Sequence, residues 1–207
     1  MERTIKIQDY KTERTLYLTG EVTEESTAKL EEEINNIIHD DLSKHNENIA
    51  NLQQIGQQYV NVYISENKFP PIKLIISSLG GSVRSGLGLY NFIKHINDDT
   101  SHCIEVEING AAASMATIIM LAADKRICGK ECSFMIHSIW SSKWYAKVQE
   151  QRDDLKETER LNSIIWNIYL KRTKITEELL TKIEKEKIDY WIGADEALKL
   201  GLVTDIF

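Results

Sequence analysis

Cysteine, proline and long apolar runs are all scarce in this chain of 207 residues. The three cysteines, Cys103, Cys128 and Cys132, form an odd set in apolar surroundings, which suits reduced thiols in a cytosolic compartment. Cys128 and Cys132 are four residues apart, but no second pair completes a zinc site, so we expect no metal and no other cofactor. The longest apolar run, 116–123, is far shorter than the roughly 20 residues that cross a bilayer.

An excess of positive charge is also missing. The net charge is −7, with acidic and basic residues spread along the chain, which argues against nucleic acid as the main partner. The N-terminal sequence MERTIKIQDYKTER is charged and has no features of a signal peptide, so we expect a cytoplasmic protein with no membrane partner. The length suffices for one sizeable core, and we therefore expect a single domain over 1–207.

Strand-like and helix-like segments alternate from Pro71 onward. The only two prolines, Pro70 and Pro71, predict a stiff, extended lead into a strand at 72–77, whose unbroken apolar character is typical of a strand covered on both faces. We expect further strands at 15–18, 103–108, 125–128, 133–137 and 202–207, and helices at about 23–38, 87–96, 145–172, 177–187 and 194–201. This alternation predicts an α/β fold with largely parallel strands.

A polar stretch and an unusually long helix stand out from this regular alternation. The polar stretch at about 39–62 is rich in Asn and Gln and is either a solvated helical excursion or a flexible insertion. VNVYIS at 60–65, where this stretch ends, is predicted to be a strand or a hairpin arm. The long helix expected at 145–172 carries apolar residues at 148, 155, 161, 164, 165 and 168, which predicts one packed face.

Ser114 stands where a strand-like segment meets a helix-like one, in the stretch EINGAAASMATIIMLAAD (107–124). A hydroxyl at this point would have free backbone N–H groups and the positive end of a helix dipole beside it, and both stabilise an oxyanion. A serine nucleophile also needs a base that accepts its proton. The alternative, which the local sequence alone favours, is a serine that caps an alanine-rich helix.

The pair Gly80 and Gly81 follows the buried strand and leads into a helix. Paired glycines allow positive φ and a close backbone approach, so their N–H groups could bind a substrate backbone or an oxyanion. A simple tight turn explains the pair equally well. The loop lacks the pattern of a nucleotide-binding site.

His137 ends the apolar strand FMIH and would stand at the carboxyl edge of the sheet, where α/β proteins gather their sites. It is the candidate base, although a structural role suits a lone histidine at a strand end as well. We interpret the other four histidines as solvated: His39, His45, His95 and His102.

These signals occur in a fixed order that resembles the proteolytic subunit of the Clp protease, ClpP. The resemblance rests on SSLGGSV (77–83), NGAAASMA (109–116), FMIHS (134–138), GADEALKLGLVTDI (193–206) and the first strand TLYLTGEV (15–22). It implies a ClpP/crotonase-like fold of repeated β-β-α units, with a handle region at about 138–172 that contains the long helix. Carried over residue by residue, it makes Ser114 the nucleophile and His137 the general base. The N–H groups of Gly81 and Met115 become the oxyanion donors, with Gly80 in the same substrate-binding loop.

The acid of the triad has two candidates. A gapless alignment from Trp191 puts Lys185 at the acidic position of the family, and a lysine cannot orient an imidazolium. Aligning KIEKE instead gives Glu186, whereas Asp189 matches a second acidic position, which looks like the best acid candidate in shorter phage-type relatives. We rank Asp189 first and Glu186 second, and either could instead be a solvated carboxylate at a helix end. Without an acid near His137, the chain would be weakly active or a scaffold subunit.

The resemblance implies a serine endopeptidase that acts on polypeptides inside an oligomeric ring or stacked rings, with an AAA+ unfoldase as a candidate partner. A phage head-processing protease with the same chemistry is an alternative. Three departures bear on these expectations: Leu79 replaces a loop proline, 139–147 lacks the family's glycine-rich strand, and the segment before the first strand is short. An acyl-CoA enzyme of the crotonase type is disfavoured, because Ser114 and His137 are both present.

Overall fold

The computed structural model describes residues 7–10, 13–140 and 147–207. Its strands form one seven-stranded sheet in the order β1-β2-β3-β4-β7, and β5 pairs with both β3 and β6. Every pairing is parallel except β5 with β6, which agrees with the predicted α/β class. The strands are β1 Thr15–Val22, β2 Ile72–Gly81, β3 Ile104–Ala113, β4 Arg126–Cys128, β5 Ser133–Ile136, β6 Tyr190–Gly193 and β7 Asp205–Ile206.

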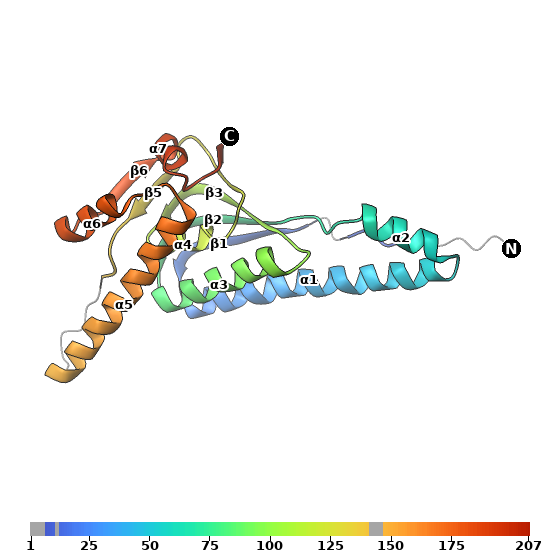
Figure 1. Cartoon of the computed structure of the whole chain (residues 1–207), viewed down its shortest axis with the longest axis horizontal. Coiled ribbons are helices and arrows are strands. Elements are labelled where there is room, and N and C mark those ends of the chain that lie inside the picture. Colours follow the sequence, from blue (N-terminus) through green and yellow to red (C-terminus); the bar gives the residue numbers. More distant parts are fainter. Residues whose placement is uncertain (1–6, 11–12, 141–146) are drawn as a thin grey trace.

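Helices α1 and α3 run side by side along one face of the sheet, and α5 projects from the end of the molecule opposite α2 (Figure 1). The short helix α4 packs between α3 and the strands β2 and β3, and all six of its residues are buried. The helices are α1 Glu24–Gln53, α2 Gln57–Glu66, α3 Val83–Asp99, α4 Met115–Met120, α5 Val148–Arg172, α6 Glu177–Glu186 and α7 Ala194–Lys199.

The six predicted strands are found: β1, β2 and β3 are longer than expected, and β4, β5 and β7 are shorter. The small residues before Ser114 belong to β3, and β2 continues through both glycines of its loop. Along β2, Ile72, Leu74 and Ile76 are buried, whereas Lys73 on the other face is exposed. The expectation of two covered faces is therefore wrong for this strand, whose second face is only partly covered. Strand β6 was not expected from the sequence.

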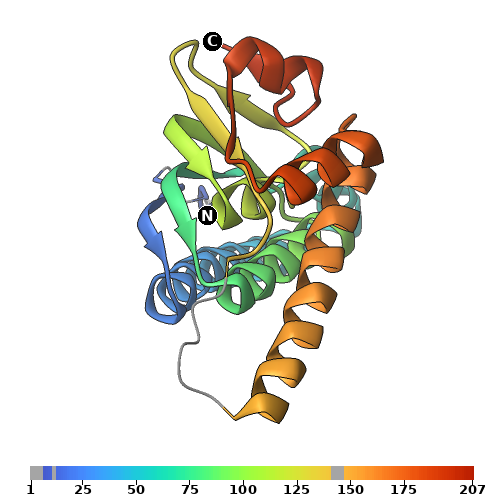
Figure 2. The same cartoon turned by 90° about the vertical axis from the view of Figure 1, so that its left-hand side faces the viewer.

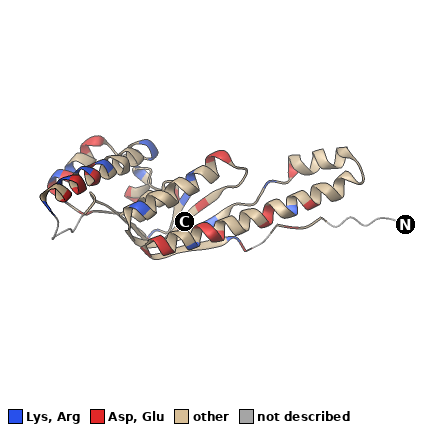
Figure 3. Ribbon diagram, turned by 90° about the horizontal axis from the view of Figure 1, so that it is seen from below, with Lys and Arg blue, Asp and Glu red and all other residues tan. Residues whose placement is uncertain are grey.

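The polar segment is helical rather than irregular. Helix α1 continues to Gln53, and 57–66 forms α2, so the strand expected at 60–65 is wrong. Val60 and Tyr63 of α2 pack with Leu52 of α1 in a small second core, because period-3.6 spacing brings these apolar side chains onto one helix face. Figure 3 shows acidic and basic residues interspersed along α1, and a nearly uncharged α2.

The interpretation of four solvated histidines is wrong for His102, which is buried. Its Nε2 atom lies 3.2 Å from Asp41 Oδ2, and the ring of Phe69 stacks on the imidazole ring of His102. Arg14 donates two hydrogen bonds of 2.8 Å to the same carboxylate. His45 is half-buried beside the same Phe69 ring. The carboxylate, the cation and the imidazole satisfy one another, which is the usual condition for burying such groups.

Only the second half of α5 packs as predicted. Ile165 and Ile168 are buried against the core, but Val148 and Leu155 are exposed where the helix extends past the body (Figure 2). The expected helix start at Tyr145 lies outside the described residues. No helix among the described residues is both long and apolar enough to cross a membrane.

Candidate active site

Ser114 lies at the junction of β3 and α4 with φ 54° and ψ −127°, a conformation that is strained for a residue with a side chain. It holds the N-cap position, but its side chain makes no capping hydrogen bond. The hydroxyl Oγ instead lies 2.8 Å from Nε2 of His137. The interpretation of Ser114 as a simple helix cap therefore does not describe its side chain.

The register of β5 and β6 brings an acid to the other side of the histidine. Ile136 pairs with Tyr190 in this antiparallel ladder, so the next position places His137 opposite Asp189. The Nδ1 atom of His137 lies 3.3 Å from Asp189 Oδ1. Lys187, in a left-handed conformation with φ 53°, ends α6 and turns the chain toward β6. The serine, the imidazole and the carboxylate thus form one connected line.

Glu186, the second candidate acid, is on the last turn of α6 and lines a separate surface with residues of that helix. Among the described residues, no ion pair joins it to His137. Its place on α6, rather than on the segment that pairs with β5, explains why the structure brings Asp189 and not Glu186 to the imidazole.

The glycine loop packs directly against the serine. Gly80 has φ 96° and Gly81 has φ 150°. A Cβ atom on Gly80 would lie 2.7 Å from Cβ of Ser114, and one on Gly81 would lie 2.3 Å from the carbonyl oxygen of Val22. Both positions therefore require glycine for space as well as for backbone conformation. Ser78 Oγ accepts the N–H of Gly80 at 3.1 Å and helps to hold the loop.

A pocket of about 190 Å³ opens beside Ser114. Met115 is the first residue of α4, where a backbone N–H has no acceptor within the helix. The pocket is lined mainly by apolar side chains: Gly81, Val83, Ser114, Met115, Ile118, His137, Ile139, Trp140, Ile165 and Tyr169. The candidate nucleophile, base and oxyanion donors therefore all border one pocket.

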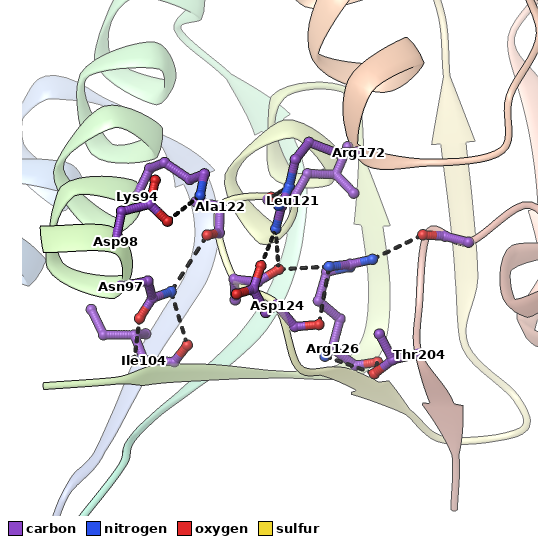
Figure 4. Close-up of polar contacts among 12 residues, drawn as sticks. Lys94, Asn97, Asp98, Ile104, Leu121, Ala122, Asp124, Arg126, Arg172 and Thr204 are labelled. Carbon is purple, nitrogen blue, oxygen red and sulfur yellow. Dashed lines mark hydrogen bonds and ion pairs between the residues drawn. The ribbon is translucent and has the colours of Figure 1, made fainter. Parts of the chain in front are cut away.

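The turn at 121–123, directly after α4, is fixed by side chains from three other elements (Figure 4). Arg172 of α5 donates to the carbonyls of Leu121 and Ala123, and Asn97 of α3 donates to that of Ala122. Arg126 of β4 also donates to Ala123, at 2.6 Å. The last carbonyls of α4 accept the N–H groups of this turn, so the bonds to the turn help to hold the helix that carries Ser114 in place.

Several residues that shape the site were not identified from the sequence. Asn162 of α5 accepts the N–H of Ile139 at 3.1 Å and donates to Glu184, which fixes the segment just after His137. A polar residue among the apolar positions of this helix was the available signal. The hydrogen bond between Thr117 and Tyr169, next to Ser114, left no comparable signal in the sequence.

No group of three or more His, Cys, Asp or Glu side chains able to hold a metal is found in the described parts of the chain. The site consists of a hydroxyl, an imidazole, a carboxylate and backbone amides. This set suits acyl transfer through a serine nucleophile, in which the base takes and returns a proton.

Comparison with known proteins gives consistent results. The model of a family described as Clp protease matches residues 42–207. The ATP-dependent Clp protease proteolytic subunit 2 of Prochlorococcus marinus is 30% identical over 165 residues, covering 78% of this chain and 76% of that protein. The subunit of Deinococcus radiodurans is 30% identical over 146 residues, covering 69% and 67%. Among solved structures, a mutant of ClpP1 from Listeria monocytogenes matches with a TM-score of 0.65 at 23% identity, covering 94% of this chain and 91% of that one.

Proposed function

The chain belongs to the Clp protease family, a family of serine peptidases, and we propose that it hydrolyses peptide bonds with Ser114, His137 and Asp189 as its catalytic triad. The observation that carries the proposal is the 2.8 Å contact between Ser114 Oγ and His137 Nε2. A serine becomes an effective nucleophile when a base within hydrogen-bond reach accepts its proton.

The reaction follows from this arrangement. His137 takes the proton as Ser114 Oγ attacks the peptide carbonyl, and Asp189 keeps the imidazole oriented through Nδ1. The backbone N–H groups of Gly81 and Met115 stabilise the oxyanion, with Gly80 allowing the substrate backbone to come close. His137 then protonates the leaving amine. In the second half of the reaction, His137 takes a proton from water as the water attacks the acyl group, and it returns this proton to Ser114 Oγ as the acid product leaves.

The pocket beside Ser114 supports a preference for peptides with apolar side chains. Its walls are mainly apolar, with Val83, Ile118 and Ile165 among them. An apolar side chain of the peptide would leave water on entering this pocket, so we expect cleavage next to apolar residues.

The assembly and setting of the enzyme are part of the same proposal. The curated relatives are named as proteolytic subunits of an ATP-dependent protease. By analogy, this chain would form a homo-oligomeric ring, or stacked rings, around an inner chamber in the cytoplasm, and receive polypeptides from an AAA+ unfoldase. We propose one domain over 1–207, with 39–62 as an insertion and 138–172 as the handle. The exposed apolar residues Val148 and Leu155 on the projecting part of α5 offer surface for subunit contacts.

Treatment with a fluorophosphonate probe tests the proposal. Wild-type protein should be labelled at Ser114 and should cleave a fluorogenic peptide, whereas a Ser114→Ala variant should do neither. Native mass measurement of the same samples gives the subunit number and shows that the variant is still assembled. A well-folded wild-type assembly that reacts with no probe would contradict the proposal and favour a scaffold subunit.

A further inference from the structure

Thr117 and Tyr169 are hydrogen-bonded neighbours of the candidate nucleophile, and Tyr169 borders the same pocket as Ser114 and His137. Thr117 is in the first turn of α4 and is fully buried, and Tyr169 of α5 is 1% exposed. Their hydroxyl groups are hydrogen-bonded to each other. Neither residue belongs to the triad or donates to the oxyanion in the mechanism above.

The hydrogen bonds of this pair have one consistent direction. Thr117 Oγ1 donates its single proton to the carbonyl oxygen of Ser114 at 2.6 Å. It can therefore only accept from Tyr169, whose hydroxyl is the donor. Burial raises the pKa of Tyr169, so its hydroxyl keeps the proton that it donates.

The carbonyl oxygen of Ser114 thus accepts two hydrogen bonds from one residue. The second comes from the backbone N–H of Thr117 at 3.0 Å. Two donors on a carbonyl oxygen occupy both of its lone-pair directions and fix the orientation of the C=O group.

This carbonyl shares a peptide unit with the N–H of Met115. The peptide bond is planar and trans, so the C=O of one residue and the N–H of the next point in opposite directions and turn together. Fixing the Ser114 carbonyl therefore fixes the direction of the Met115 N–H. That N–H is the proposed oxyanion donor, and the strained backbone of Ser114 would otherwise relax by rotating this same unit.

We propose that Thr117 and Tyr169 are positioning residues that hold the Met115 N–H in the direction of the oxyanion. The inference rests on the proposed serine peptidase function and adds to it. Because Tyr169 comes from α5, it also links the alignment of the oxyanion donor to the seating of that helix.

The test compares the deletion of these two hydroxyl groups with matched deletions elsewhere. Thr117→Val and Tyr169→Phe remove the two hydroxyl groups without much change in shape. The controls are Thr27→Val, since buried Thr27 also bonds a first-turn carbonyl, that of Thr23 at 2.9 Å, and Tyr63→Phe. Buried Tyr63 carries a bonded hydroxyl in the second core.

For each variant, kcat and KM are measured on a fluorogenic peptide, and inhibition by a peptide aldehyde is compared with that by the matching peptide alcohol. The hemiacetal that the aldehyde forms with serine places its oxygen where the oxyanion develops, whereas the alcohol reports ground-state binding. We expect Thr117→Val to lower kcat and aldehyde affinity roughly tenfold, less than the 10²–10³-fold that follows outright loss of a donor. KM and alcohol affinity should change less than about twofold.

The remaining variants separate a positioning role from a structural one. Thr117→Ser keeps the hydroxyl and should restore kcat, and Tyr169→Phe should lower kcat roughly threefold because Thr117 is then less polarised. Equal kcat values for Thr117→Val and Thr27→Val would overturn the inference. If Thr117→Val does not fold, Tyr169→Phe is compared with Tyr63→Phe instead, and equal kcat values for these two variants would overturn the inference. A wild-type chain without turnover or labelling would instead remove the proposed function, and this inference with it.

Discussion

Asp189 meets His137 because two short strands pair in one register. The Nδ1 atom of His137 lies 3.3 Å from Asp189 Oδ1, one position beyond the pair Ile136 and Tyr190 of the β5–β6 ladder. The Asp189 side chain is 62% exposed, so water also reaches this carboxylate. It can orient the imidazole, while solvent screens part of its charge.

Asp189→Asn should lower kcat/KM on a short peptide by roughly 10²-fold or more, because the imidazole loses the acceptor that sets its tautomer. The loss should stay below the roughly 10⁴-fold known for a buried triad aspartate, since Asp189 is exposed. Glu186→Gln is the matched control and should leave kcat/KM unchanged. The reverse ranking of the two variants would transfer the acid role to Glu186.

Gly80→Ala should strongly reduce turnover, because Gly80 packs against the nucleophile. The added Cβ would lie 2.7 Å from Ser114 Cβ and 2.8 Å from the carbonyl oxygen of Ala113, so the serine must move. A displacement of this size lowers kcat roughly 10²-fold.

Gly201→Ala serves as the control for the Gly80 variant, because Gly201 also has a positive φ of 74° but only ordinary contacts around its Cβ position. It should cost about 1–2 kcal/mol of stability and leave kcat unchanged. Chemical denaturation and peptide turnover measure both effects. Full turnover by Gly80→Ala would show that the loop does not constrain Ser114.

Arg126→Lys should destabilise the fold by about 2–4 kcal/mol, because one ammonium group cannot replace a guanidinium that serves several carbonyls. Arg126 is buried and donates to the carbonyls of Ala123, Gly201 and Leu202 among others (Figure 4). Burial also lowers the pKa of Arg126 to about 10. Arg84→Lys, at an exposed ion pair with Glu157, should stay within about 0.5 kcal/mol of wild type. Urea unfolding compares the two variants, and equal midpoints would contradict the expectation.

Stability should fall as the pH drops below about 6.5, in part through His102. Burial lowers the pKa of His102, whose ring faces the Asp41 carboxylate and the Arg14 guanidinium. The unfolded chain then takes up the proton at a higher pH than the folded chain does. The contribution of His102 is therefore complete above the unfolded-state pKa and is lost as the pH falls through the folded-state pKa.

Urea unfolding at pH 7.5 and pH 5.5 measures this dependence on pH. His102→Gln should reduce the difference between the two pH values. His95→Gln, at an exposed histidine, should leave the difference as it is in wild type. A His102→Gln variant with an unchanged difference would show that the buried cluster does not titrate in this range.

The sequence by itself determined the parts of the protein that depend on local pattern. The α/β class followed from alternating apolar segments, because strand and helix periodicities are properties of neighbouring residues. The candidate nucleophile at a strand–helix junction, the glycine pair and the strand-end histidine were identified for the same reason. The order of these segments also identified the family, and the comparisons with known proteins confirm it.

Only the tertiary structure decided which groups meet. The sequence ranked Asp189 ahead of Glu186, but the contact of Asp189 with the imidazole depends on the register of β6, a strand of four residues that is too short to give a sequence pattern. The burial of His102 depends on Asp41 and Phe69, which lie more than 30 residues away in the chain. The bond between Thr117 and Tyr169 depends on how α5 crosses α4. Contacts between distant segments are set by packing and register, and no local periodicity encodes them.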